Sequence, residues 1–279
     1  MVLLELAEPP HLRALYRRAV LGALTRRSGT ELPDTTLVLR DVGVGRERLA
    51  RYAKVCGYRL SDTLPATYPH VLAFPLAVAV MAERDFPLPM IGLVHVANRI
   101  EVLRPVDAGE RLELTVRAAD LRAHDRGRAF DVRATASVGD EVVWRGISTY
   151  LRKEKPRARQ APDAAPAASG SLWQVGRSVG AEYAKVSGDH NPIHTSRLAA
   201  RAFGYPGPIA HGMWSAARCL AALEGRLPPE YAVDVAFRRP LVLPARVCFS
   251  ATPGVERWEL ALTDRRTGAP HLTGAVTAG

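Results

Sequence analysis

The sequence repeats one six-residue pattern at two places about half the chain apart. Segment 52–57 reads Tyr-Ala-Lys-Val-Cys-Gly, and segment 183–188 reads Tyr-Ala-Lys-Val-Ser-Gly. A shorter match follows at nearly the same offset, where Arg-Pro-Val at 104–106 corresponds to Arg-Pro-Leu at 239–241. Two ordered matches at nearly one spacing indicate a duplicated unit. The chain is therefore expected to build one architecture twice.

The region between the two copies has the composition of a linker. Segment 153–170 contains three prolines, clustered charges and an Ala-Pro stretch, and it shows no apolar periodicity. We therefore predict four parts: an N-terminal extension over 1–40, a first unit over 41–152, a linker over 153–170 and a second unit over 171–279.

Each unit follows the same plan of elements. A short helix carries the Tyr-Ala-Lys-Val segment, and a longer apolar helix is expected over 69–84 in the first unit and over 211–223 in the second. Strands with alternating polarity follow, which is typical of an antiparallel sheet with one covered face. The predicted fold class is α+β. The expected strands are 91–102, 111–118, 129–138, 142–152, 231–238, 245–251, 258–263 and 271–277.

The net charge of +10 does not identify a partner. Of the 38 basic residues, 34 are arginine, which a GC-rich genome produces as readily as selection for an anionic ligand. Aromatic residues make up 6% and do not interleave with the basic runs as a stacking surface for nucleic acid requires. We therefore expect no nucleic-acid partner.

No stretch is long enough for a membrane span. The longest apolar run, 71–82, contains Pro75 and is shorter than the roughly 20 residues that a spanning helix needs. The basic amphipathic stretch 12–27 is expected to pack on the first unit rather than on a membrane surface. Cys56, Cys219 and Cys248 are far apart and form no C-x-x-C pair, which fits a reducing compartment. We expect a cytoplasmic protein.

One octet, Ser-Gly-Asp-His-Asn-Pro-Ile-His at 187–194, carries the strongest chemical signal. Asn191 suits a helix N-cap and Pro192 suits the first helical position, so a helix is expected to run to about residue 202. Asp189 and His194 then stand together at a helix N-terminus and can hold one water between them, as general acid–base chemistry requires. Ordinary helix capping explains the same pattern.

A metal site is the alternative use of these histidines. His190 and His194 are four residues apart, but Pro192 lies between them and no Cys or Glu completes a ligand set. We therefore expect no metal.

The octet resembles a family signature. Segment 188–194, Gly-Asp-His-Asn-Pro-Ile-His, with Tyr183 five residues before it, is similar to the G-D-x-N-P-[LI]-H motif of the MaoC-like (R)-specific enoyl-CoA hydratases. Segment 209–213, Ile-Ala-His-Gly-Met, resembles the second conserved block of that family. The resemblance implies a hot-dog fold, in which an antiparallel sheet wraps a long helix. With the duplication, it implies a double hot-dog over 41–279.

The resemblance also implies an activity. Asp189 and His194 would activate water, Asn191 would orient it, and the Gly212 backbone N–H would stabilise negative charge on a thioester oxygen. The reaction would interconvert trans-2-enoyl and (R)-3-hydroxyacyl thioesters of CoA or an acyl carrier protein in fatty-acid metabolism, without a cofactor. His211 would contact substrate. Arg201, Arg238 and Arg239 are candidates to bind the phosphates of CoA or of a carrier-protein prosthetic group.

The first unit departs from the motif. Tyr58 stands where the second unit has Asp189, and no Asn-Pro-x-His follows, so we predict one active site per chain. His70, near the start of the apolar helix, is expected to be structural. The apolar stretch 71–82 could line a tunnel for a long acyl chain.

A second class of function remains open, in which the chain is a non-catalytic acyl-thioester binder or the scaffold subunit of a heteromeric dehydratase. The intact Asp189, Asn191 and His194 argue against it. The direction of reaction is also open, because a catalyst accelerates both directions. Two oligomeric states are expected: a monomer, in which the two units of one chain pair as a pseudo-dimer, or a homodimer of the whole chain.

Overall fold

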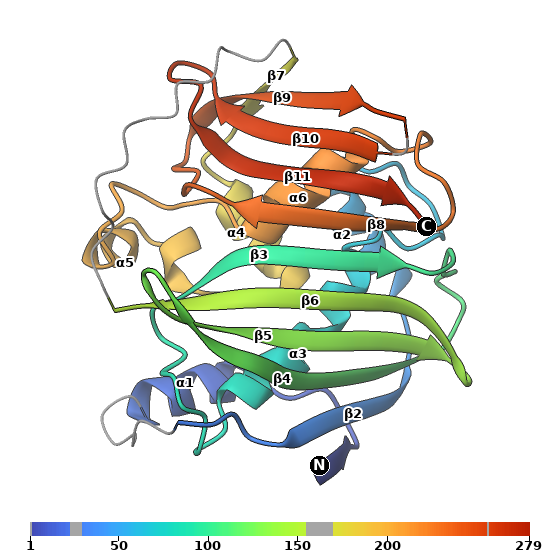
Figure 1. Cartoon of the computed structure of the whole chain (residues 1–279), viewed down its shortest axis with the longest axis vertical. Helices are drawn as coiled ribbons and strands as arrows, with labels where there is room; N and C mark the ends of the chain where they lie inside the picture. The colour runs from blue at the N-terminus through green and yellow to red at the C-terminus, as the bar shows by residue number, and fades with distance from the viewer. Residues whose placement is uncertain (1, 23–29, 155–169, 256) are drawn as a thin grey trace.

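A computed structural model describes residues 2–22, 30–154, 170–255 and 257–279 (Figure 1). The first part of the chain contains β1 (Val2–Leu6), α1 (Leu12–Gly22), β2 (Thr35–Val42), α2 (Arg46–Cys56), α3 (Tyr68–Met81), β3 (Leu93–Val102), β4 (Leu112–His124), β5 (Gly127–Val138) and β6 (Glu141–Lys153). The second part contains β7 (Ser171–Val175), α4 (Val179–Ser187), the 3-10 helix η1 (Pro192–His194), α5 (Arg197–Ala202), α6 (Gly212–Ala221), β8 (Tyr231–Phe237), β9 (Ala245–Pro253), β10 (Arg257–Asp264) and β11 (Pro270–Ala278).

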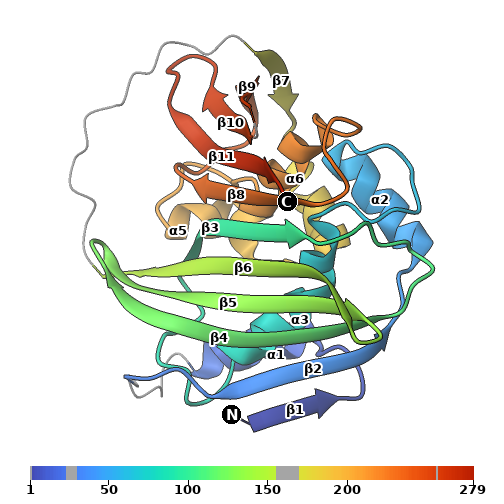
Figure 2. The same cartoon turned by 45° about the vertical axis from the view of Figure 1, so that its right-hand side comes forward.

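The strands form one continuous sheet in the order β1-β2-β4-β5-β6-β3-β8-β11-β10-β9-β7. The order β2-β4-β5-β6-β3 in the first unit is mirrored by β7-β9-β10-β11-β8 in the second. Neighbouring strands of both units are antiparallel, and β1 adds a parallel strand beside β2. Helix α3 lies behind the first half of the sheet and α6 behind the second (Figures 1 and 2). This arrangement is the double hot-dog, which confirms the predicted α+β class.

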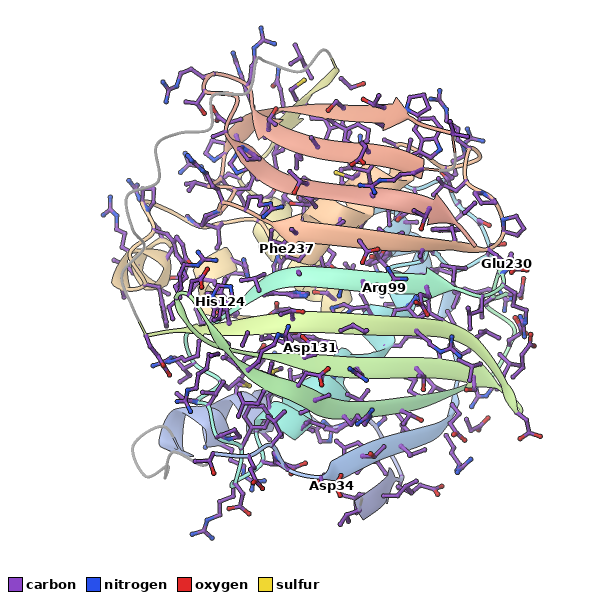
Figure 3. The ribbon with its side chains drawn as sticks, in the orientation of Figure 1. Asp34, Arg99, His124, Asp131, Glu230 and Phe237 are labelled. Atoms are coloured by element: carbon purple, nitrogen blue, oxygen red, sulfur yellow. The ribbon has the colours of Figure 1, made fainter. Side chains whose placement is uncertain are left out.

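The two units join through β3 and β8, which pair from Ala97 opposite Ala236 to Val102 opposite Tyr231. Arg99, marked at this seam in Figure 3, places a guanidinium nitrogen 2.5 Å from the Asp234 carboxylate across it. The seam is therefore part of the backbone ladder and not a loose interface between two domains.

The repeated segments that indicate the duplication meet in the core. Tyr52 of α2 and Tyr183 of α4 are buried with their ring centroids 6.1 Å apart. The Arg48 guanidinium donates to the Val186 carbonyl, and the Trp214 indole N–H donates to the Val55 carbonyl. Each unit thus donates one hydrogen bond to the repeated segment of the other, so the two units are related by a pseudo-two-fold axis.

Helix α3 is apolar around its whole circumference because the first half of the sheet and neighbouring helices enclose it. Ten of its residues are buried, including Val71, Leu76 and Val80. A helix enclosed on every side needs no polar face, which explains the uninterrupted apolar run in the sequence. No helix within the described residues has the length and hydropathy needed to cross a membrane.

The structure differs from the sequence-based expectations at the edges of the units. Strand β2 begins at Thr35, inside the segment expected as an extension, because it pairs with β4 in the first half-sheet as β7 pairs with β9 in the second. The helix expected over 12–27 is α1, which begins at Leu12 as predicted; residues 23–29 and most of the expected linker, 155–169, lie outside the described residues.

Candidate active site

The octet of the second unit folds into a turn and two short helices, not into the single helix that we expected. Asn191 caps η1, with its side-chain oxygen accepting from the Ile193 N–H at 3.3 Å. The chain then becomes extended at Ser196, whose hydroxyl accepts from the Ala199 N–H and starts α5 as a separate helix. The predicted cap is confirmed, and the continuous helix to residue 202 is wrong because Ser196 provides a second N-cap.

Asp189 lies between α4 and η1 with its side chain 25% exposed. Its Oδ1 accepts two hydrogen bonds, from the Asn191 N–H and from the Tyr16 hydroxyl, each 3.1 Å long. Burial acts to raise the pKa of Asp189, but the neighbouring imidazoles of His211 and His194 and these two hydrogen bonds outweigh it and lower the pKa below its usual value. The carboxylate is therefore ionised at neutral pH.

His194 is buried on η1 and held in one orientation. Its Nδ1 lies 2.8 Å from the Ile209 carbonyl oxygen. Since a carbonyl only accepts, Nδ1 carries the proton, and Nε2 of the neutral ring is left with a lone pair. Burial lowers the pKa of His194, which keeps this lone pair available. The Ile209 N–H also donates to the Ile193 carbonyl, so two hydrogen bonds at Ile209 join the two motif blocks.

His211 completes the centre from the start of α6. Its Nε2 donates to the Asp189 backbone carbonyl at 3.0 Å, and its ring stacks on His194 with centroids 3.6 Å apart. Burial, together with the neighbouring His194, lowers the pKa of His211 to about 3. The sequence-based prediction gives this residue a role in binding substrate. In the structure, His211 supports the backbone of Asp189.

Gly212 is the first residue of α6, where backbone N–H groups have no acceptor within the helix. A Cβ at this position would lie 3.0–3.1 Å from three atoms of the Phe237 ring. Phe237, labelled in Figure 3, ends β8 and makes an edge-to-face contact with His95 at 5.0 Å. The close packing of Phe237 on the start of α6 therefore favours a residue without a side chain.

The first unit supplies a polar wall opposite Asp189 that the sequence did not reveal. It consists of His70 on α3, His95 on β3 and Tyr150 on β6, with the His95 ring stacked on Tyr150 at 4.8 Å and on His70 at 6.0 Å. Burial lowers the pKa of His70 to about 4 and that of His95 to about 3. That His70 has a structural role stays a prediction. Isolated histidines in a helix and a strand carry no motif that could have grouped them in advance.

The three predicted phosphate ligands are dispersed. Arg201 is exposed on α5, the Arg238 side chain donates to the Thr273 hydroxyl, and the Arg239 backbone accepts a hydrogen bond from His271. A cavity of about 570 Å³ is lined largely by the segment 240–246. Its lining includes His271 and three other arginines: Arg246, Arg265 and Arg266.

The segment 240–246 that lines this cavity pairs with the second motif block. Leu241 accepts a backbone hydrogen bond from Ala210, and Leu243 donates one to Pro208. Asp264 also lines the cavity, and its carboxylate accepts hydrogen bonds from the backbone N–H groups of Arg266 and Thr267. Within the described part of the chain, none of the three arginines has an ion-pair partner. The cavity is therefore basic and adjoins the segment that leads into His211.

Asp189, His194 and His211 also bring potential metal-ligand atoms within 4.8 Å of one another. Metal coordination requires the in-plane lone pairs of both imidazoles to converge on one point. The two rings are stacked with centroids 3.6 Å apart and an interplanar angle of 24°, so their in-plane lone pairs lie in two nearly parallel, separate planes. The geometry favours an acid–base pair over a metal centre.

Comparison with known proteins identifies the family of this chain. Residues 157–247 match the family model described as the MaoC like domain. The chain is 35% identical to 3-hydroxyacyl-thioester dehydratase X of Mycobacterium tuberculosis over 97% of this chain and 99% of the relative. A crystal structure of HtdX from the same organism superposes with a TM-score of 0.79 over 88% of this chain and 100% of that chain, at 35% identity.

Two more distant proteins of M. tuberculosis extend the comparison. The enoyl-CoA hydratase ChsH3 is 28% identical over 66% of this chain and 71% of the relative. A conserved protein described as having a double hotdog fold is 11% identical, with a TM-score of 0.53 over 87% of this chain and 96% of that chain, and it supports the fold alone. The chain belongs to the MaoC-like dehydratase family, in its double hot-dog form.

Proposed function

We propose that this protein is an (R)-specific hydratase/dehydratase that interconverts trans-2-enoyl and (R)-3-hydroxyacyl thioesters in fatty-acid metabolism. The observation that carries the proposal is the juxtaposition of an ionised carboxylate, Asp189, with His194, whose Nδ1 is fixed by the Ile209 carbonyl. The relatives named as a 3-hydroxyacyl-thioester dehydratase and an enoyl-CoA hydratase support the same reaction class.

In the hydration direction, Asp189 and His194 hold the water. As its oxygen bonds to the β-carbon of the enoyl thioester, the pair accepts one proton and then returns a proton to the α-carbon on the same face. Asn191 shapes the turn: its side chain caps η1 and its N–H fixes Asp189 Oδ1. The reverse sequence removes water from the hydroxyacyl thioester.

Negative charge develops on the thioester oxygen while the α-carbon is carbanion-like. The Gly212 N–H at the start of α6 would donate to this oxygen, and the helix dipole stabilises the same charge. The charge then needs no metal or redox cofactor for its stabilisation.

The phosphates of CoA or of a carrier-protein prosthetic group would bind at the basic cavity beside segment 240–246. A volume of about 570 Å³ suits a ligand of nucleotide size, and Arg246, Arg265 and Arg266 offer guanidinium groups to it. Arg201, Arg238 and Arg239, which do not line this cavity, remain proposed contacts. An acyl path along α3 stays a prediction, since the sheet and neighbouring helices enclose that helix; activity that collapses beyond short chains would contradict it.

The first test is to mix purified protein with crotonyl-CoA and with a C8–C12 trans-2-enoyl-CoA and follow the enoyl-thioester absorbance. The product is then offered to an (R)-specific 3-hydroxyacyl dehydrogenase. Hydration with an (R) product supports the proposal, and the preferred length tests the acyl path. No turnover with CoA or carrier-protein thioesters would favour the alternative, a non-catalytic thioester binder or scaffold subunit. The cytoplasmic location and the monomeric or homodimeric state stay predictions.

A further inference from the structure

The N-terminal helix α1 packs directly on the motif that carries the proposed chemistry. Leu12 and Tyr16 lie four residues apart and so share one face of α1. The Leu12 side chain closes over Gly188, where an added Cβ would lie 2.8 Å from its Cδ1. Gly188 has φ +84°, so both its backbone conformation and its neighbour favour glycine. Figures 1 and 2 show α1 beside α3, on the same side of the sheet.

Tyr16 uses this packing to reach the Asp189 carboxylate. Its hydroxyl donates to Oδ1 at 3.1 Å, across 173 positions of the sequence. Oδ1 also accepts the Asn191 N–H at 3.1 Å. A carboxylate oxygen has about two lone-pair sites, so these two donors fill Oδ1.

The other oxygen, Oδ2, is left for the reaction. His211 Nε2 lies 3.8 Å from Oδ2, too far for a hydrogen bond, and it donates instead to the Asp189 backbone carbonyl. Two donors on one oxygen hold the plane of the carboxylate and direct the unfilled oxygen to the water. The phenol stays a donor throughout the working pH range, since burial and the Asp189 charge raise the pKa of Tyr16 far above neutral.

We propose that Tyr16 is a positioning residue of the active site, which holds Asp189 through Oδ1 so that Oδ2 and His194 face the reacting water. This inference rests on the proposed hydratase function and extends it. It makes the N-terminal segment, which lies outside the repeated units, a working part of the active site.

The test compares Tyr16→Phe with wild type in enoyl-thioester hydration across a pH series. The matched control is Tyr68→Phe, which also removes a buried hydroxyl; among the described residues the Tyr68 hydroxyl has no hydrogen-bond partner. The pH series must account for every titratable group whose charge interacts with Asp189: His194, His211, His70, His95, Tyr150 and Tyr183. Circular dichroism and melting curves check that each variant folds.

We expect kcat of Tyr16→Phe to fall by roughly tenfold to a hundredfold, the loss for one hydrogen bond to a charged group, while KM changes little. The acid limb of its pH profile moves to higher pH because the carboxylate loses a donor. Tyr68→Phe behaves as wild type. An unchanged kcat and profile in Tyr16→Phe overturns the inference, and so does an equal loss at every pH without a moved limb. If wild type itself shows no turnover, the proposed function fails instead.

Discussion

The rings of His194 and His211 stack with centroids 3.6 Å apart, and each ring commits one nitrogen to a backbone carbonyl. Two stacked imidazoles repel each other when both are charged, and burial already disfavours the charged form. His211 accordingly stays neutral well below physiological pH, with a pKa of about 3. The stack therefore keeps a single ring, His194, free to exchange protons with Asp189 and water.

Acid is predicted to destabilise the fold through its buried histidines. Burial lowers the pKa of His95 and of His211 to about 3 and that of His70 to about 4, whereas unfolded histidines titrate near 6.5. Between these values the unfolded chain binds more protons, so stability falls as pH falls below about 6.5. Each such group costs about 2 kcal/mol at pH 5.

Chemical denaturation at pH 7.5 and pH 5 measures this loss. His95→Phe keeps an aromatic ring against Tyr150 and removes one titrating group, so its stability should depend less on pH than that of wild type. His124→Gln, at an exposed position, should retain the full dependence. Equal pH dependence in wild type and His95→Phe would contradict the assignment.

Gly212→Ala is predicted to impair catalysis more than folding. The new methyl meets the Phe237 ring at 3.0–3.1 Å and crowds the approach to the helix N-terminus, so we expect kcat/KM to fall by on the order of tenfold to a hundredfold. Gly45→Ala is the matched control, since Gly45 also stands at the start of a helix and its Cβ would meet nothing within 4 Å. Equal kcat/KM in both variants would argue against a substrate at Gly212.

Charge reversal at the basic cavity is predicted to weaken substrate binding without changing the chemistry. Arg265→Glu combined with Arg266→Glu should raise KM for a CoA thioester by on the order of tenfold, leave kcat nearly unchanged, and have less effect on a pantetheine thioester that lacks the nucleotide. Arg117→Glu, an exposed arginine on β4, is the control. A similar KM in the double variant and the control would place the phosphates elsewhere.

The repeat and the apolar patterning predict an α+β unit built twice, and the family resemblance predicts that the unit is a hot-dog. The Tyr52 and Tyr183 segments identified α2 and α4, and apolar helices followed by alternating strands identified α3, α6 and most of the sheet. The sequence does not predict the outer strands β1, β2 and β7. Strands β1 and β7 have only five residues each, so their periodicity gives a weak signal.

The motif predicted that Asp189, Asn191 and His194 lie together, because all three belong to one local turn. It gives no indication of Tyr16, which donates to Asp189, or of His95 and Tyr150, which interact with its charge; the three come from distant elements of the chain. Such partners depend on tertiary packing and not on local spacing. The choice of phosphate-binding arginines has the same cause. The sequence contains 34 arginines, and only the fold shows which of them line a cavity.

The most direct test of the central claim is the hydration rate of a trans-2-enoyl thioester by wild type and Asp189→Asn, with the configuration of the product determined. Asp120→Asn, at an exposed carboxylate of the first unit, serves as the control. Wild type and the control should form the (R)-3-hydroxyacyl thioester, and Asp189→Asn should be slower by about 10²–10⁴ with an unchanged fold. Turnover by Asp189→Asn at the wild-type rate would contradict the account.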